Sequence, residues 1–273
     1  MMNVDKEKCI GCSKCIDDCL VNDIIMVKGK AQIKNESCFK CGHCIAICPA
    51  DAVSSNEYKM NEVKEYKEEK FSVPADNLLN FIKFRRTIRQ FKAKKVEKKK
   101  IKKIIEAGRF APTGSNQQDV SFTVVKDKID YFRGLVLKNL NEKGKSILNN
   151  LEPEKMKFKK YAEMWIKMYQ DYQNENLDND LLFFNAPLVI VVTANSTVNG
   201  SLASANMELM ANALDLGALF SGFTLRGAKG QPEIRKFLNI ENDKEIITSL
   251  VIGYPDVKYL RTVPRKKANI NWT

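Results

Sequence analysis

The sequence has 273 residues and 44% of them are hydrophobic, enough to bury the core of one large domain beside a small one, or of two medium-sized domains. No apolar run approaches the roughly 18 residues that a membrane-spanning helix needs. The N-terminal stretch MMNVDKEKC is charged from its fifth residue and shows no apolar signal-peptide core. We therefore expect a cytoplasmic protein without a membrane partner.

The formal net charge of +12 raises the question of nucleic-acid binding. The Lys residues are scattered over expected helices and connections, and no module of basic and aromatic residues accompanies them. We therefore expect no nucleic-acid partner. Bound anionic cofactors would offset part of the positive charge, and the remainder would steer an acidic redox partner toward the protein.

Cysteine is confined to the N-terminal part of the chain, in two runs that repeat. Residues 9–19 read CIGCSKCIDDC and residues 38–48 read CFKCGHCIAIC, each a C-x2-C-x2-C-x3-C run. Thiolates at this spacing hold cubane iron–sulfur clusters, whereas structural zinc sites use two separated C-x2-C pairs. Clustered cysteines in a reducing cytosol indicate metal or redox chemistry rather than disulfides. The expected iron ligands are Cys9, Cys12, Cys15, Cys19, Cys38, Cys41, Cys44 and Cys48.

This repeat resembles the bacterial ferredoxins that carry two [4Fe–4S] clusters. In those proteins the fourth cysteine of each run is exchanged between the clusters. The resemblance implies one cluster on Cys9, Cys12, Cys15 and Cys48, and a second on Cys38, Cys41, Cys44 and Cys19. The pattern departs from the family at Leu20, because a proline follows Cys48 but not Cys19. The only histidine, His43, is expected to be a bystander, since cysteines fill all eight ligand places.

The N-terminal domain is expected to depend on its clusters. Residues 24–34 predict a short hairpin around Lys28-Gly29-Lys30, and little else could form a core. The following stretch, EYKMNEVKEYKEEK, is charged in both signs and poor in apolar residues, which predicts a linker or a surface helix. We place a ferredoxin-type domain at 1–56, a charged linker at 57–75 and a second domain at 76–273.

In the second domain, apolar periodicity predicts helices and strands in alternation. The predicted elements are a helix at 96–108, a strand at 121–125, helical structure over 138–174, a buried strand at 187–194, a buried helix at 202–216, a turn at 217–223 and a strand at 246–252. This domain contains no His and no Cys, which excludes nucleophilic hydrolysis by those groups. We expect no catalytic side chain and a cofactor that does the chemistry.

Two short motifs suit a phosphorylated flat cofactor. Arg85-Arg86-Thr87-Ile88-Arg89 offers guanidinium and hydroxyl donors to a phosphate, and Pro112-Thr113-Gly114-Ser115-Asn116-Gln117-Gln118 permits a close backbone approach. Their spacing resembles the flavin-binding core of the nitroreductase family. The resemblance implies an α+β fold, with a central sheet flanked by helices, in a homodimer that binds FMN at its interface.

The same resemblance implies the residues that bind FMN. Arg85, Arg86, Thr87 and Arg89 would hold the phosphate and ribityl chain, helped by Arg265 and Lys267 in the late basic cluster. Pro112, Thr113, Gly114 and Asn116 would come from the partner subunit, and Ser221 and Gly222 would lie near the ring. The late cluster could otherwise be a solvated tail.

The large side chains of 158–172 leave two interpretations open. Phe158, Tyr161, Trp165, Met168 and Tyr172 repeat at helical spacing, and most such stripes are core. In the resembling family the corresponding region is variable and shapes the substrate pocket, so the stripe could instead cap the flavin.

The combination predicts an FMN-dependent, iron–sulfur flavoprotein oxidoreductase that reduces an electron-poor small molecule such as a nitroaromatic, quinone or activated alkene. A ferredoxin, a flavodoxin or NAD(P)H would supply electrons, and no dinucleotide fingerprint decides among them. The alternative is an electron-transfer adaptor between protein partners with no small-molecule substrate.

Overall fold

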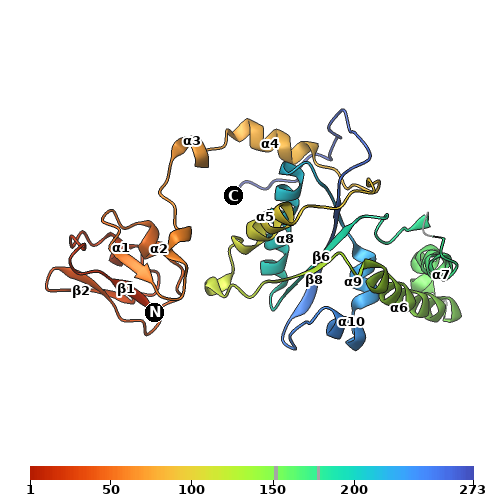
Figure 1. The fold of residues 1–273 in the computed structure, drawn as a ribbon, viewed down its shortest axis with the longest axis horizontal. Coiled ribbons are helices and arrows are strands. Elements are labelled where there is room, and N and C mark those ends of the chain that lie inside the picture. Colours follow the sequence, from red (N-terminus) through yellow and green to blue (C-terminus); the bar gives the residue numbers. More distant parts are fainter. Residues whose placement is uncertain (151–152, 177–178) are drawn as a thin grey trace. The chain divides into compact units, whose positions relative to one another are not determined.

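The computed structural model describes residues 1–150, 153–176 and 179–273 and divides the chain into two compact units. The first unit comprises Met1–Pro74 together with Thr113–Gln117, and the second comprises Ala75–Pro112 and Gln118–Thr273. No helix among these described residues is long and apolar enough to span a membrane. Figure 1 traces the chain through both units.

The first unit is built from two small antiparallel sheets and short helices. Strand β1 (Met2–Val4) pairs with β4 (Val53–Ser55), and β2 (Ile24–Val27) pairs with β3 (Lys30–Ile33), which confirms the predicted hairpin. The short helices are α1 (Lys14–Asp17), α2 (His43–Ala46), η1 (Met60–Glu62) and α3 (Glu68–Phe71). The main apolar cluster contains four buried residues, Cys9, Ile24, Ala31 and Ala52, and Met2 and Val53 are buried as well. Cysteine thus contributes directly to this core.

The second unit is a four-stranded antiparallel sheet in the order β5-β6-β8-β7. Its strands are β5 (Ser121–Val125), β6 (Leu188–Ala194), β7 (Gly217–Phe220) and β8 (Glu245–Gly253). The predicted strands at 121–125, 187–194 and 246–252 are confirmed. The predicted turn at 217–223 is wrong in part, because Gly217–Phe220 pairs with β8 before Gly222 begins a helix.

Helices cover both faces of this sheet (Figure 1). On one face lie α5 (Lys98–Arg109) and α8 (Thr197–Ala213). On the other lie α6 (Ile129–Asn149), α7 (Lys159–Gln173), α9 (Gly222–Ala228) and α10 (Pro232–Phe237). The helix α4 (Ala75–Phe84) precedes them, and the 3-10 segments η2 (Gly114–Asn116) and η3 (Pro153–Phe158) lie between.

Strand β6 is apolar except for Thr193 because each face of the sheet is buried. Leu188, Ile190 and Val192 join the core beneath α5 and α8, whereas Val189 and Val191 join the core beneath α6 and α7. Successive side chains of a strand point to opposite faces, so a strand in a sheet covered twice presents apolar residues to both faces.

Three helical predictions need adjustment. The helical region expected at 138–174 begins earlier, at Ile129, and α6 is separate from α7; residues 151–152 of that prediction lie outside the described part. Helix α8 begins at Thr197 rather than 202, since Ser196 caps it by accepting from the backbone N–H of Asn199. The expectation that this helix is buried all round is wrong for the single chain, because Leu202 is 42% exposed.

Candidate functional site

Cysteines from both runs line one cavity of the first unit. Cys9, Cys12 and Cys15 from the first run and Cys48 from the second surround about 360 Å³ of space, part of it open to solvent. The other residues of its lining are mostly apolar: Val4, Ile10, Gly11, Ala31, Ala50, Ala52 and Val53, with Ser13 and Lys14. These four thiols are the set that the ferredoxin resemblance assigns to one cluster. A thiolate donor set in a small apolar cavity fits an iron–sulfur cluster.

Backbone N–H groups donate to cysteine sulfurs of both runs. Ala31 and Ala52 donate to Cys9 Sγ and Cys48 Sγ over 3.5 and 3.3 Å, and Lys40 donates to Cys38 Sγ over 3.4 Å. Asp23 does the same for Cys19 over 3.4 Å. Hydrogen bonds of this kind stabilise a charged sulfur and tune the reduction potential of a cluster.

The cysteine pKa values differ with environment. The backbone hydrogen bond from Ala31 lowers the pKa of Cys9. Burial raises the pKa of Cys15, and it raises that of Cys44 to about 11. Because a cluster binds thiolates, these two partly buried cysteines are expected to release their protons as the metal binds. Among the described residues, no three His, Cys, Asp or Glu side chains converge as the ligands of a single metal ion do.

In the second unit, the basic turn runs along the edge of the sheet. Thr87 forms a parallel bridge with Ala218 of β7, and Ile88 N donates to Ala218 O over 3.1 Å. Ile88 is buried and lies where a Cβ at Gly217 would stand, so its position is fixed. Thr87 and Arg89 are exposed beside it.

The two preceding arginines have unused donors. Arg85 forms an ion pair with Glu208 of α8, and Arg86 Nη2 donates to Lys83 O over 2.5 Å. The Nε atoms of both Arg85 and Arg86 are buried and have no hydrogen-bond partner in the described protein. Buried guanidinium donors without partners are costly and suit a missing anionic ligand, so this turn fits a flavin phosphate. The Glu208 partner, 123 residues along the chain, is not foreseeable from the motif.

Ser221 and Gly222 follow β7, the strand that Thr87 bridges. The Ser221 hydroxyl is used internally, since it accepts from Thr224 N and Thr224 Oγ1 at 3.3 and 2.8 Å. No atom lies within 4 Å of the place where a Cβ of Gly222 would stand. The backbone here is therefore open to a flat ligand, and the turn, Ser221 and Gly222 share one edge of the sheet.

The remaining predicted flavin residues are placed differently. Pro112 belongs to the second unit, whereas Thr113, Gly114 and Asn116 belong to the first, where Asn116 Nδ2 donates to the carbonyls of Phe39 and Lys40 at 3.0 Å. Ser115, Asn116 and Gln118 have φ values of 49°, 54° and 49°, a left-handed conformation that is costly for residues with a side chain. Arg265 and Lys267 are exposed in a C-terminal segment without helix or strand.

Trp165 lies in the core of the second unit. It is 2% exposed, packs with Met168 in the cluster beneath α6, and meets Phe223 edge to face at 5.8 Å. This burial agrees with the core interpretation of the aromatic stripe. Tyr161 of the same stripe is 46% exposed. Phe223 directly follows Gly222, so this cluster supports the segment that we expect beside the flavin.

The second unit is a sheet covered on both faces with a basic turn at its edge, and the first unit has a cavity lined by cysteines. Together they define an oxidoreductase that combines a flavin domain with an iron–sulfur domain. The nitroreductase family model matches residues 82–254, more than half of the sequence, and the chain belongs to that family of FMN-dependent enzymes. A 4Fe-4S dicluster domain model matches residues 1–49. The predicted recognition and fold class are confirmed.

Individual relatives match one part or the other. The 4-nitrobenzoate reductase of Pseudomonas putida is 26% identical over 207 residues, covering 67% of this chain and 89% of the relative. One component of an ion-translocating oxidoreductase complex of Methanosarcina acetivorans is 44% identical over 45 residues, which are 16% of this chain and only 17% of that protein's length. The structure of a Bacteroides fragilis nitroreductase with bound FMN superposes with a TM-score of 0.52 at 20% identity, covering 71% of this chain and 98% of the other.

Proposed function

We propose that this protein passes electrons between two [4Fe–4S] clusters and FMN and reduces an electron-poor organic acceptor, namely a nitroaromatic, a quinone or an activated alkene. Clusters carry single electrons, and bound FMN converts between one- and two-electron transfer. The observation that supports this most directly is the cavity lined by cysteines of both runs, in a chain whose other unit belongs to a flavoenzyme family.

Arg85, Arg86, Thr87 and Arg89 hold the FMN phosphate in this proposal, together with Arg265 and Lys267. Its support is the pair of buried guanidinium Nε atoms without partners. Two variants test this role. Arg86→Ala is expected to lower FMN occupancy because it removes a phosphate contact. Lys83→Ala, which removes a neighbouring exposed cation, is expected to leave occupancy unchanged. Equal occupancy in both purified variants would remove Arg86 from the site.

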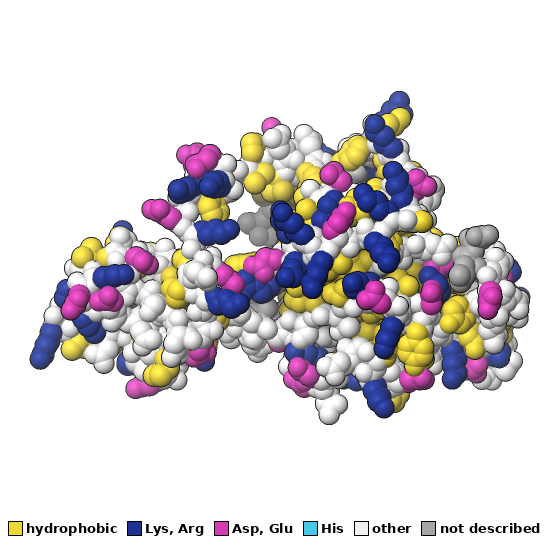
Figure 2. Space-filling view, viewed as in Figure 1, with side chains coloured by type: hydrophobic (Ala, Val, Ile, Leu, Met, Phe, Trp, Pro, Cys, Tyr) yellow, Lys and Arg dark blue, Asp and Glu magenta, His cyan; other side chains and the backbone are white. Residues whose placement is uncertain are grey.

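We further propose a homodimer in which Pro112, Thr113, Gly114 and Asn116 reach the partner subunit's FMN. Helix α4 supports a dimer because it leaves apolar side chains uncovered in the single chain. None of its residues is buried, and Leu78, Leu79 and Ile82 are 44%, 47% and 40% exposed. Apolar side chains show on this segment in Figure 2. Leu79→Asp is expected to halve the mass measured by light scattering, and Asn77→Asp serves as the control.

The charge distribution favours an acidic protein as the electron donor. Residues 1–74 contain 11 Lys and no Arg against 12 Asp and Glu, which leaves 34 basic residues against 21 acidic ones in the rest of the chain. Figure 2 shows Lys and Arg spread over the second unit. Ferredoxins and flavodoxins would be steered by this field, and their turnover would weaken steeply with added salt, unlike turnover with NAD(P)H.

The first experiment is an absorbance spectrum of anaerobically purified protein, before and after addition of NADPH or NADH. Flavin and iron–sulfur bands that bleach identify the nicotinamide as a donor. Bands that persist until reduced ferredoxin is added identify a protein donor instead. A spectrum without flavin contradicts the proposed function.

A second experiment tests the cluster route. Cys12→Ser is expected to abolish ferredoxin-driven turnover while FMN stays bound, and Ser54→Ala, an exposed residue of the same unit, retains both. Unchanged ferredoxin-driven turnover in Cys12→Ser would contradict electron entry through the clusters. Saturable reduction of an organic acceptor distinguishes the enzyme from an adaptor between protein partners.

A further inference from the structure

Asp23 has a buried carboxylate that holds the loop leading into the second cysteine run. It is 1% exposed. Its Oδ2 accepts from Asn35 N at 2.7 Å, and its Oδ1 accepts from Glu36 N and Ser37 N at 3.1 and 2.9 Å. These three donors are the last residues before Cys38. One side chain therefore satisfies three consecutive backbone N–H groups of this loop.

The main chain of Asp23 is tied to the first cysteine run. Its N–H donates to Cys19 Sγ over 3.4 Å, and its carbonyl accepts from Lys34 N at 2.8 Å. Asp23 thus contacts Cys19 directly and reaches Cys38 through the loop. The ferredoxin resemblance assigns these two cysteines to the same cluster.

In the other half of the repeat, the loop before the cysteine run is held without a carboxylate from the opposite half. Position 52, which lies 29 residues after Asp23, is an alanine whose N–H donates to Cys48 Sγ over 3.3 Å. The loop before Cys9 is closed by its own Asp5, whose Oδ1 accepts from Glu7 N and Lys8 N at 2.9 and 3.2 Å. The two halves therefore share their main-chain pattern and differ in the source of the carboxylate.

The difference coincides with the departure from the ferredoxin pattern at Leu20. Cys48 is followed by Pro49, which stiffens the chain after the ligand, whereas Leu20 follows Cys19 and is 86% exposed. A buried carboxylate is unfavourable unless hydrogen bonds compensate, and Asp23 has three. The half that lacks the proline is therefore also the half in which a buried carboxylate holds a loop next to a cysteine run.

We propose that Asp23 is the positioning residue of the second cluster, holding Cys19 and Cys38 at the separation at which both ligate it. This inference rests on the two clusters of the proposed function. Asp23 does not itself ligate iron. Its loss is expected to release that cluster and to spare the one on Cys9, Cys12, Cys15 and Cys48.

The test compares Asp23→Ala and the isosteric Asp23→Asn with Asp51→Ala, a control that removes an exposed carboxylate of the same unit. Iron and sulfide per chain, FMN content and the electron paramagnetic resonance spectrum of the reduced protein are measured after anaerobic purification. Wild type and Asp51→Ala are expected to hold about eight iron atoms and the Asp23 variants about four. The spectrum of two interacting clusters then simplifies to that of one, with FMN unchanged.

Further substitution identifies the cluster that is lost. In the Asp23→Asn background, adding Cys41→Ser is expected to remove no more iron, whereas adding Cys12→Ser removes the rest. Full iron content in both Asp23 variants, or equal loss of both clusters from Asp23→Asn, would overturn the inference. Wild type holding one cluster would instead refute the two-cluster function on which it rests, a result visible before any variant is made.

Discussion

The two units are stabilised by different means. The main apolar cluster of the first contains four buried residues, one of them a cysteine, whereas the second has two extensive apolar clusters, one on each face of its sheet. A unit with so little buried apolar area is expected to depend on metal groups for its stability, while the larger one folds on its own side chains. Cofactor loss and core substitution should therefore damage separate parts of one chain.

The largest expected effect comes from removing iron. Chelation under air should unfold residues 1–74, because the clusters are their main cross-links, and should leave the second unit folded. Limited proteolysis followed by mass spectrometry would then detect cleavage within 1–74 and protection of β6 and β8. Protection of both units after iron loss would contradict the comparison.

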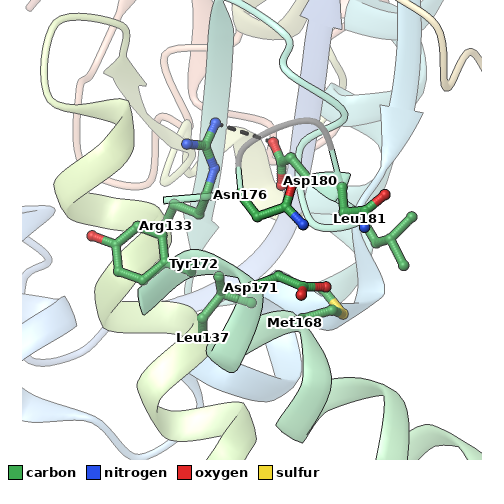
Figure 3. A pocket seen from close by; sticks show the side chains of 9 residues that line it. Arg133, Leu137, Met168, Asp171, Tyr172, Asn176, Asp180 and Leu181 are labelled. Atoms are coloured by element: carbon green, nitrogen blue, oxygen red, sulfur yellow. Dashed lines mark ion pairs between the residues drawn. The ribbon is translucent and has the colours of Figure 1, made fainter. Parts of the chain in front are cut away.

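A buried ion pair gives the next largest effect, within the second unit. Arg133 Nη2 lies 3.0 Å from Asp180 Oδ2, with side-chain exposures of 5% and 2% (Figure 3). Asp180 also accepts from the backbone N–H groups of Leu182 and Phe183 at 3.0 Å. Asp180→Ala leaves the buried Arg133 paired with Asp130, whose side chain is 72% exposed, and should cost about 3 kcal/mol in denaturant unfolding. Lys167→Ala, at an exposed pair with Asp171, should cost less than about 1 kcal/mol.

A core truncation should lower stability without lowering iron content. Leu250 of β8 is fully buried beneath α5 and α8, so Leu250→Ala removes packed methyl groups and should cost about 2–5 kcal/mol. Leu260→Ala, at a residue 72% exposed, should change the free energy of unfolding by less than about 0.5 kcal/mol. Loss of iron from Leu250→Ala would show that the two units are not independent.

The smallest effect depends on pH. Burial would raise the pKa of Asp119, but hydrogen bonds from the Asn199 side chain and from Asn195 N and Ser196 N outweigh it and lower that pKa. A depressed carboxylate pKa stabilises the fold above its unfolded value of about 3.9, and the stabilisation disappears as pH falls through the folded value. Asp119→Asn should therefore melt lower than wild type at neutral pH, by circular dichroism, and the gap should close in acid. If the difference in melting temperature were the same at both pH values, the effect would come from altered packing or hydrogen bonding and not from the charge of Asp119.

The sequence predicted the helices and strands that are determined by a local pattern of residues. The period of the apolar residues located β5, β6 and β8, and the spacing of the cysteines located the first unit. The strand at Gly217–Phe220 was missed because four residues beginning with glycine carry little pattern, and its pairing with β8 decides its conformation. Helix α4 was missed because its apolar face is not buried within the chain.

The contacts that complete the candidate site are distant in sequence and were not predictable. Nothing in the basic turn indicates that Arg85 pairs with Glu208 or that Thr87 bridges Ala218. The role of Asp23 did leave a signal, since aligning the two halves at their offset of 29 sets an aspartate against Ala52. When one half has a charged residue where the other half has a small buried residue, that difference indicates a contact made in only one half of the repeat.

The crossed use of residues between the two halves also constrains the order of events during synthesis. Cys48 completes the cavity of Cys9, Cys12 and Cys15, and Asp23 of the first half accepts from three N–H groups of the loop before Cys38. On the proposed ligand assignment, neither half alone contains a complete set of ligands. Iron loading is therefore expected to wait until both runs have emerged from the ribosome, and a chain that ends between the runs is expected to retain no iron–sulfur cluster.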